Sequence, residues 1–96
     1  YQQIYATNNP ASNSTQFVAI VNNAHLGGTI TFEVYSVLGK LLWNKTNDIF
    51  STTITQNWNL CTNNSIPLPK GMYLYRAILN SPVGKEEMKT QRIIIK

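Results

Sequence analysis

The chain has 96 residues, of which 43% are hydrophobic and only 12% are charged, so it suits one domain with a single core and excludes a multidomain enzyme. Its one cysteine, Cys61, cannot form an internal disulfide, and its one histidine, His25, leaves few candidates for a catalytic or metal-binding cluster. The formal net charge is +4, but the 8 basic residues are scattered along the sequence, which favours a solvated surface over a nucleic-acid interface.

Two features of the sequence bear on its cellular context. Apolar runs are only a few residues long, whereas about 20 are needed to cross a bilayer, and the first residues do not resemble a signal peptide. We therefore expect a chain that does not span a membrane. Because it begins with Tyr1 rather than Met, we expect residues 1–96 to be a single domain excised from a longer secreted protein. No motif predicts a cofactor.

The first predicted element is a short extended segment at residues 3–6. Asn9-Pro10 then favours a turn, because proline disfavours helix at the residue before it. The first full strand is predicted to start near Gln16. Its residues 17–21 are apolar at successive positions, as in a strand that is buried on both faces.

The clearest strand comes next in the chain. Ile30, Phe32 and Val34 alternate with more polar residues, which is the pattern of a strand with one face on a core. Gly39 then allows the positive φ of a tight hairpin turn. Residues 41–43 are therefore predicted to return as the partner strand.

The second half of the chain is predicted to contain three more strands. The polar stretch 44–48 is interpreted as a connection, and residues 59–70 as a long loop, because two prolines in it cannot donate to a strand ladder. Gly71 opens the second of these strands, and a turn at residues 81–85 leads to the third. The three strands are expected at residues 51–58, 72–79 and about 87–96.

Short strands at this spacing predict an all-β fold, an immunoglobulin-like antiparallel β-sandwich of about seven strands. Trp43 and Trp58 stand at strand ends and are predicted to be core anchors. Tyr73 lies where such a sandwich places its corner tyrosine, and Tyr75 is then a core residue. The residues expected to be structural are Gly39, Trp58, Gly71, Tyr73 and Tyr75.

Three stretches of the sequence carry a family resemblance: the hairpin 34–43, the segment that begins Trp58-Asn59, and the segment 67–77. Together they resemble the immunoglobulin-like module of the flagellar hook-cap type. Asn9-Pro10 and the ending 92–96 are, in addition, similar to the C-terminal domains of the Bacteroidetes type IX secretion system. Within that group the chain most resembles the C-terminal domain of the PorU sortases, which are gingipain-like, C25-type cysteine peptidases.

The resemblance implies a folded, non-catalytic secretion signal. The type IX translocon would recognise it at the outer membrane and pass it to a PorV-like barrel protein. The peptidase residues of a sortase would lie in a different domain. The implied location is the periplasm in transit and then the outer membrane or cell surface, and the isolated domain is expected to be a monomer.

The C-terminal hairpin, residues 72–96, is the expected recognition element, and its last strand carries the expected contacts. If Ile93 and Ile95 face the core, the alternation of a strand directs Ile94 to the other side. The expected partner-binding residues are Lys89, Arg92, Ile94 and Lys96. This strand is also expected to offer a pairable edge. Deletion of residues 93–96 is then predicted to abolish surface display while the upstream part stays soluble.

Two other functions remain open. A carbohydrate-binding or adhesive accessory domain needs two or three coplanar, exposed aromatic side chains, for which Tyr35 and Trp43 are the candidates. An assembly module of an extracellular appendage, like the hook cap, predicts self-association instead.

Overall fold

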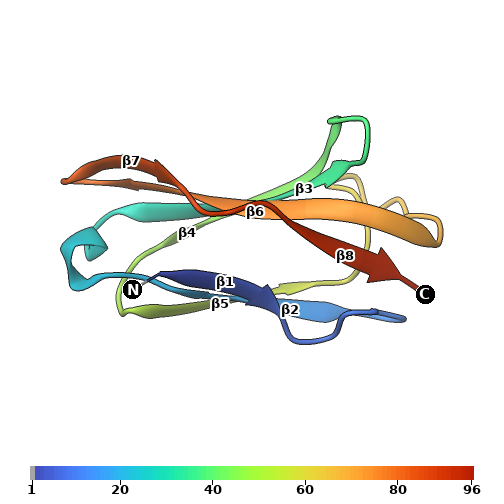
Figure 1. Cartoon of the computed structure of the whole chain (residues 1–96), viewed down its shortest axis with the longest axis horizontal. Helices are drawn as coiled ribbons and strands as arrows, with labels where there is room; N and C mark the ends of the chain where they lie inside the picture. The colour runs from blue at the N-terminus through green and yellow to red at the C-terminus, as the bar shows by residue number, and fades with distance from the viewer. Residues whose placement is uncertain (1) are drawn as a thin grey trace.

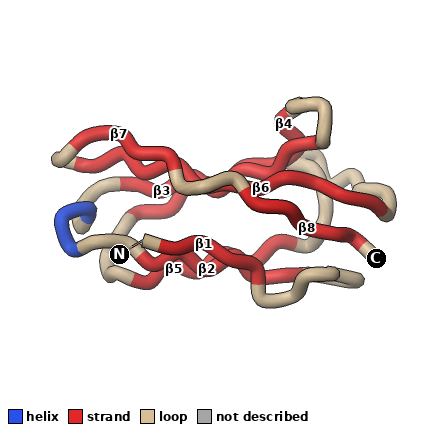
Figure 2. The backbone as a smooth tube through the Cα atoms, in the orientation of Figure 1, coloured by secondary structure: helices blue, strands red, loops and turns tan. Residues whose placement is uncertain are grey.

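The computed structural model describes residues 2–96 and shows two antiparallel β-sheets packed face to face (Figure 1). Within these residues the chain forms eight strands, so the predicted all-β sandwich is confirmed with one strand more than expected. Strands make up most of the chain (Figure 2). The elements are β1 (Gln3–Ala6), β2 (Thr15–Ile20), the 3₁₀ turn η1 (Asn23–His25), β3 (Thr29–Ser36), β4 (Leu41–Asp48), β5 (Thr53–Trp58), β6 (Gly71–Ser81), β7 (Gly84–Glu87) and β8 (Gln91–Ile95).

Each sheet has a distinct strand order. The smaller sheet contains three strands in the order β1-β2-β5, and the larger contains five. In the larger sheet β4, β3 and β6 are neighbours in that order, and both β7 and β8 pair with β6. The core lies between the two sheets, because buried side chains from both of them form one hydrophobic cluster.

An aromatic cluster occupies the centre of this core. Phe17 of β2 is fully buried, and its ring centroid lies 5.0–6.0 Å from those of Phe32, Trp43, Trp58 and Tyr75. These four rings come from β3, β4, β5 and β6, so one side chain of the smaller sheet joins three strands of the larger one. Trp43 and Trp58 are core anchors, as their positions at strand ends predict.

Strands β3 and β6 alternate between core and solvent. Ile30, Phe32 and Val34 of β3 are buried, as predicted from their spacing. In β6 the residues two apart are buried in the same way, and they pair with β3 along its whole length. The buried residues of β6 are Tyr73, Tyr75, Ala77 and Leu79.

The polar stretch 44–48 is not the predicted connection, because β4 continues through it to Asp48. Asn44, Lys45 and Thr46 are exposed and carry no apolar signal. β4 is an edge strand, and its backbone pairs with β3 as far as Thr29, which does not depend on side-chain polarity.

The β3–β4 hairpin turns at Gly39, as predicted. Gly39 has a φ of 92°, a conformation that glycine adopts without the Cβ clash of other residues. The amide of Ser36 donates to the carbonyl oxygen of Lys40 at 2.9 Å and closes the turn.

The long loop 59–70 is held to the sandwich by two aromatic side chains. The indole Nε1 of Trp58 donates to the carbonyl oxygen of Cys61 at 2.9 Å. The hydroxyl of Tyr73 donates back to the carbonyl oxygen of Pro69 at 2.6 Å, which is the geometry of a corner tyrosine. Both rings are buried, so the loop is attached directly to the core.

The last predicted strand is split into two. β7 pairs with residues 78–81 of β6, whereas β8 pairs with residues 71–75 of the same strand. Between them the amide of Met88 still donates to the carbonyl oxygen of Ala77 at 2.8 Å. The predicted hairpin is therefore present, but its return strand starts earlier, at Gly84, and is interrupted at residues 88–90.

Candidate functional site

The side chains of β8 divide between the core and the solvent as the alternation predicts. Ile93 and Ile95 are 0% and 5% exposed, and both belong to the hydrophobic core. Ile94 is 37% exposed and Arg92 is exposed as well. Residues 92 and 94 are therefore accessible to a partner, whereas residues 93 and 95 stabilise the fold.

A surface groove of about 510 Å³ runs beside β8. It brings together Lys89, Arg92 and Ile94, three of the four residues that the sequence proposes for partner binding. Lys96 is exposed at the end of the strand but does not line the groove. The full lining is Asn9, Met72, Lys89, Thr90, Gln91, Arg92 and Ile94.

Four groove residues are not among those proposed for partner binding: Asn9, Met72, Thr90 and Gln91. The last three lie within the predicted C-terminal hairpin, whereas Asn9 lies outside it. Met72 pairs with Ile94 across the β6–β8 ladder and is 43% exposed, so the two side chains form an apolar pair on the outer face. The register of the predicted hairpin was the signal that could have located Met72. Asn9 reaches the groove from a segment 83 residues away in sequence, and no local pattern indicates that contact.

The outer edge of β8 is closed, which contradicts the expected pairable edge. The side-chain amide of Asn9 donates to the carbonyl oxygen of Arg92 at 2.9 Å, and its Oδ1 accepts from the amide of Ile94 at 3.0 Å. One step further along, the amide of Ala11 donates to the carbonyl oxygen of Ile94 at 2.8 Å, and the amide of Lys96 donates to Ala11 at 2.7 Å. We call residues 9–11 the edge strap. It forms hydrogen bonds with the backbone groups of β8 to which an added strand would otherwise bind.

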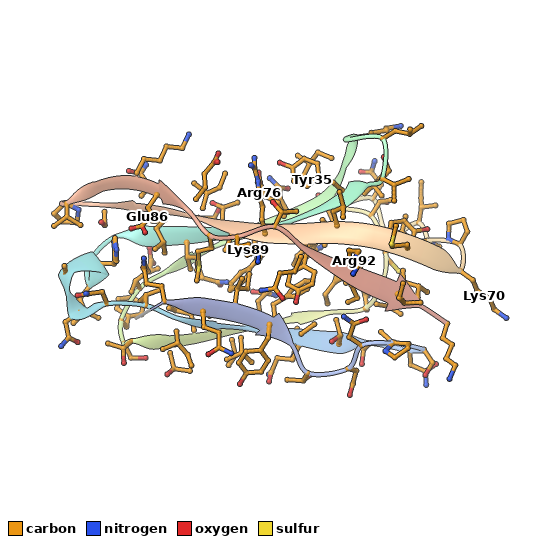
Figure 3. All side chains as sticks on the ribbon, viewed as in Figure 1. Tyr35, Lys70, Arg76, Glu86, Lys89 and Arg92 are labelled. Atoms are coloured by element: carbon orange, nitrogen blue, oxygen red, sulfur yellow. The ribbon has the colours of Figure 1, made fainter. Side chains whose placement is uncertain are left out.

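Arg76 lies at the centre of a polar network on the outer face of the larger sheet (Figure 3). Its Nε donates to Glu33 at 2.9 Å and its Nη1 to Glu87 at 3.3 Å. Its Nη2 donates to the hydroxyl of Tyr35 at 3.1 Å, and the guanidinium lies 5.3 Å from the centroid of that ring. The hydrogen bond to Glu33 raises the pKa of Arg76 above its usual value. This charge is therefore neutralised within the chain.

The other seven cations have no such partner within residues 2–96, and four of them lie near β8 and the adjoining end of β6. Among residues 2–96, the side chains of Lys70, Lys89, Arg92 and Lys96 make no hydrogen bond or ion pair, and all four are exposed. The pairing of Gly71 with Ile95 brings Lys70 and Lys96 to the same end of the sheet. The β6–β8 register thus adds Lys70 to Lys89, Arg92 and Lys96, which the sequence analysis had already placed around Ile94.

Three tyrosines of the larger sheet have a raised pKa. Burial is the main cause for Tyr35, Tyr73 and Tyr75, and the hydrogen bond to Glu33 raises the pKa of Tyr35 further. Burial disfavours the charged phenolate, so the folded chain holds these side chains neutral at a pH where the free phenol ionises.

We expect the free energy of unfolding to fall as the pH rises above 10, because the unfolded chain ionises these tyrosines near 10.0 and the folded chain resists it. A raised folded-state pKa gives stability that is complete below 10.0 and lost above it. Urea unfolding at pH 9 and pH 11 measures the change. The Tyr75→Phe variant should lose less stability between these conditions than the wild type, whereas an equal loss would contradict this explanation.

The remaining candidate groups do not join the groove. His25 is buried, with Nδ1 2.8 Å from the hydroxyl of Ser81 and Nε2 3.3 Å from Glu86, so it ties η1 to the β6–β7 hairpin. Cys61 lies in the long loop, and its Sγ is 3.4 Å from the carbonyl oxygen of Asn59. No helix within residues 2–96 has the length and apolarity needed to span a membrane.

The aromatic residues proposed for carbohydrate binding do not form an exposed platform. Trp43 is only 9% exposed and packs against Trp58 in the core. Tyr35 is half-buried, and its hydroxyl donates to Glu33 at 2.8 Å while Arg76 covers its ring. The two side chains named for this alternative are therefore engaged within the fold.

Comparisons with known proteins bear on the fold. No protein-family model and no curated protein sequence matches the chain. Among solved structures, dimeric latent PorU from Porphyromonas gingivalis matches 98% of this chain with a TM-score of 0.87 and 23% identity. FlgD from Xanthomonas campestris, whose structure concerns hook capping in flagellar assembly, matches 97% of it with a TM-score of 0.69 and 18% identity. The chain spans 9% of the PorU chain and 63% of the FlgD chain, and at these identities it shares their fold.

Proposed function

We propose that this chain is a non-catalytic docking domain that acts as a C-terminal secretion signal of the type IX system, most like the corresponding domain of PorU. In this proposal the parent protein is exported through the periplasm to the outer membrane or cell surface. The translocon and a PorV-like barrel protein are the partners. Any peptidase activity belongs to another part of the parent protein.

One observation carries the proposal. The fold match to PorU covers 98% of this chain but only 9% of the PorU chain, as expected of one small module within a much larger enzyme. The groove beside β8 supports a docking role, because an exposed apolar pair and unpaired cations lie together there without any nucleophile–base arrangement.

The structure changes how this function should be tested. Deletion of residues 93–96 removes Ile93 and Ile95 from the core, so the loss of display would not separate recognition from unfolding. A better test is a secreted reporter fused upstream of this chain in a Bacteroidetes host with type IX machinery. The reporter with the chain should reach the cell surface, and the same reporter without it should not.

Ile94→Asn is the matching substitution, because Ile94 is exposed and lies in the groove. We expect it to reduce surface display at least tenfold while the melting temperature of the purified chain changes little. Leu41→Asn is the control, since Leu41 is 43% exposed on the distant edge strand β4. Equal display of the two variants would refute the role of the groove, and display of the reporter without the chain would refute the proposal itself.

The similarity to FlgD favours one other candidate, an assembly module that binds copies of itself. It matches 97% of the chain at a TM-score of 0.69. A docking domain is expected to be a monomer, whereas an assembly module is expected to self-associate. Light scattering of the purified chain over a range of concentrations distinguishes the two.

A further inference from the structure

We propose that the β8 groove binds an acidic segment of the partner protein through side chains, and that the partner does not add a strand to β8. This inference rests on the docking function proposed above and specifies the chemistry of the partner. Its basis is the closed edge of β8, the distribution of charge over the molecule and the lining of the groove.

The edge strap determines the mode of binding. Strand addition needs free amide and carbonyl groups along an edge. The outward groups of Arg92, Ile94 and Lys96 are already bonded to Asn9 and Ala11 at 2.7–3.0 Å. A partner strand would have to break these four hydrogen bonds, whereas the outer side chains of β8 are accessible without any rearrangement.

The charged residues around the groove determine the sign of the charge that the partner must carry. Lys70, Lys89, Arg92 and Lys96 form an unpaired basic set around the groove and the adjacent end of β6. The acidic residues are engaged or distant, since Glu33 and Glu87 bind Arg76 and Glu86 lies beside His25.

The fourth acid, Asp48, pairs with Thr29 at the other end of the larger sheet. β6 extends about 30 Å between these ends, several times the Debye length of about 8 Å in physiological salt, so Asp48 does not offset the charge of Lys70 and Lys96. Glu86 and Glu87 lie closer to Lys89, but they are engaged with His25 and Arg76. Figure 3 shows Lys70 and Glu86 near opposite ends of the molecule.

The lining of the groove favours a protein over other anionic partners. No aromatic side chain lines it, so it offers no surface on which nucleic-acid bases could stack. Its apolar members, Met72 and Ile94, lie on strands beside a hollow rather than on a protruding loop that inserts into a bilayer. A segment with acidic residues on either side of an apolar one fits both features.

The first experiment measures binding of a fluorescent twelve-residue peptide of alternating Glu and Leu to the purified chain. We expect saturable binding that weakens at least tenfold between 50 and 300 mM NaCl and at least tenfold in Lys89→Glu/Arg92→Glu/Lys96→Glu. The control Lys40→Glu/Lys45→Glu/Lys85→Glu changes the net charge equally at exposed lysines outside the groove and should bind within threefold of the wild type.

Several outcomes would overturn the inference. These are the absence of binding at millimolar peptide, equal binding of a Lys–Leu peptide, or equal loss in the control variant. Binding to phosphatidylglycerol vesicles with none to the acidic peptide would identify a membrane surface instead. Asn9→Ala opens the edge, and an increase of tenfold or more in peptide affinity would identify strand addition as the true mode.

The reporter assay separates this inference from the function on which it rests. If the wild-type chain directs the reporter to the surface and the groove charge-reversal variant loses display, both are supported. If display persists in that variant, the docking function stands and the acidic partner is wrong. If the wild-type chain does not direct display at all, the docking function itself is wrong.

Discussion

Phe17→Ala should destabilise this chain by about 3–5 kcal/mol, the usual cost of removing a fully buried phenylalanine side chain. Phe17 is 0% exposed and its ring lies within 6.0 Å of four other aromatic rings, so truncation leaves a cavity that rigid neighbours cannot fill. A domain of this size has a total stability of about 5–14 kcal/mol. Thermal unfolding followed by circular dichroism should show a melting temperature lower by about 20 °C.

Leu26→Ala is the control for this prediction, because Leu26 is 41% exposed and lies outside the hydrophobic core. It should change stability by less than about 0.5 kcal/mol, as surface substitutions usually do. Similar melting temperatures for the two variants would show that the aromatic cluster is not the main stabilising element.

Ile93→Ala and Ile94→Ala should have very different effects although the residues are adjacent. Ile93 is fully buried, so its truncation should cost about 2–5 kcal/mol, whereas Ile94 is 37% exposed and should cost less than about 1 kcal/mol. Urea unfolding of the purified variants measures both values.

The reporter assay measures the effect of the same two substitutions on surface display. Ile94→Ala should reduce surface display with stability nearly unchanged, and Ile93→Ala should reduce it only through the loss of folded protein. If Ile94→Ala were the more destabilising of the two, the assignment of the faces of β8 would be wrong.

Much of the fold follows from local patterns in the sequence. Ile30, Phe32 and Val34 reveal β3 because a strand with one buried face alternates every two residues. Gly39 indicates the hairpin turn because few other residues adopt its positive φ. These features depend only on residues close together in the chain, so the sequence contains the information directly.

The features that sequence reasoning missed depend on pairing between distant segments. β4 continues through a polar stretch because its backbone pairs with β3, and β7 carries no buried residue but still pairs with β6. The contact of Asn9 with β8 spans more than 80 residues. The sequence analysis correctly assigned which side chains of β8 face the core and which face solvent. This alternation contains no information about the closed edge.

The edge strap has a consequence for transplanting this region into other proteins. The groove takes Asn9 from the start of the chain, Met72 from β6, and residues 89–92 and Ile94 from near the end, so it is a discontinuous epitope. A short tag copied from the last strand alone would reproduce the order of its side chains without the hollow between them. Only the complete folded sandwich presents this surface.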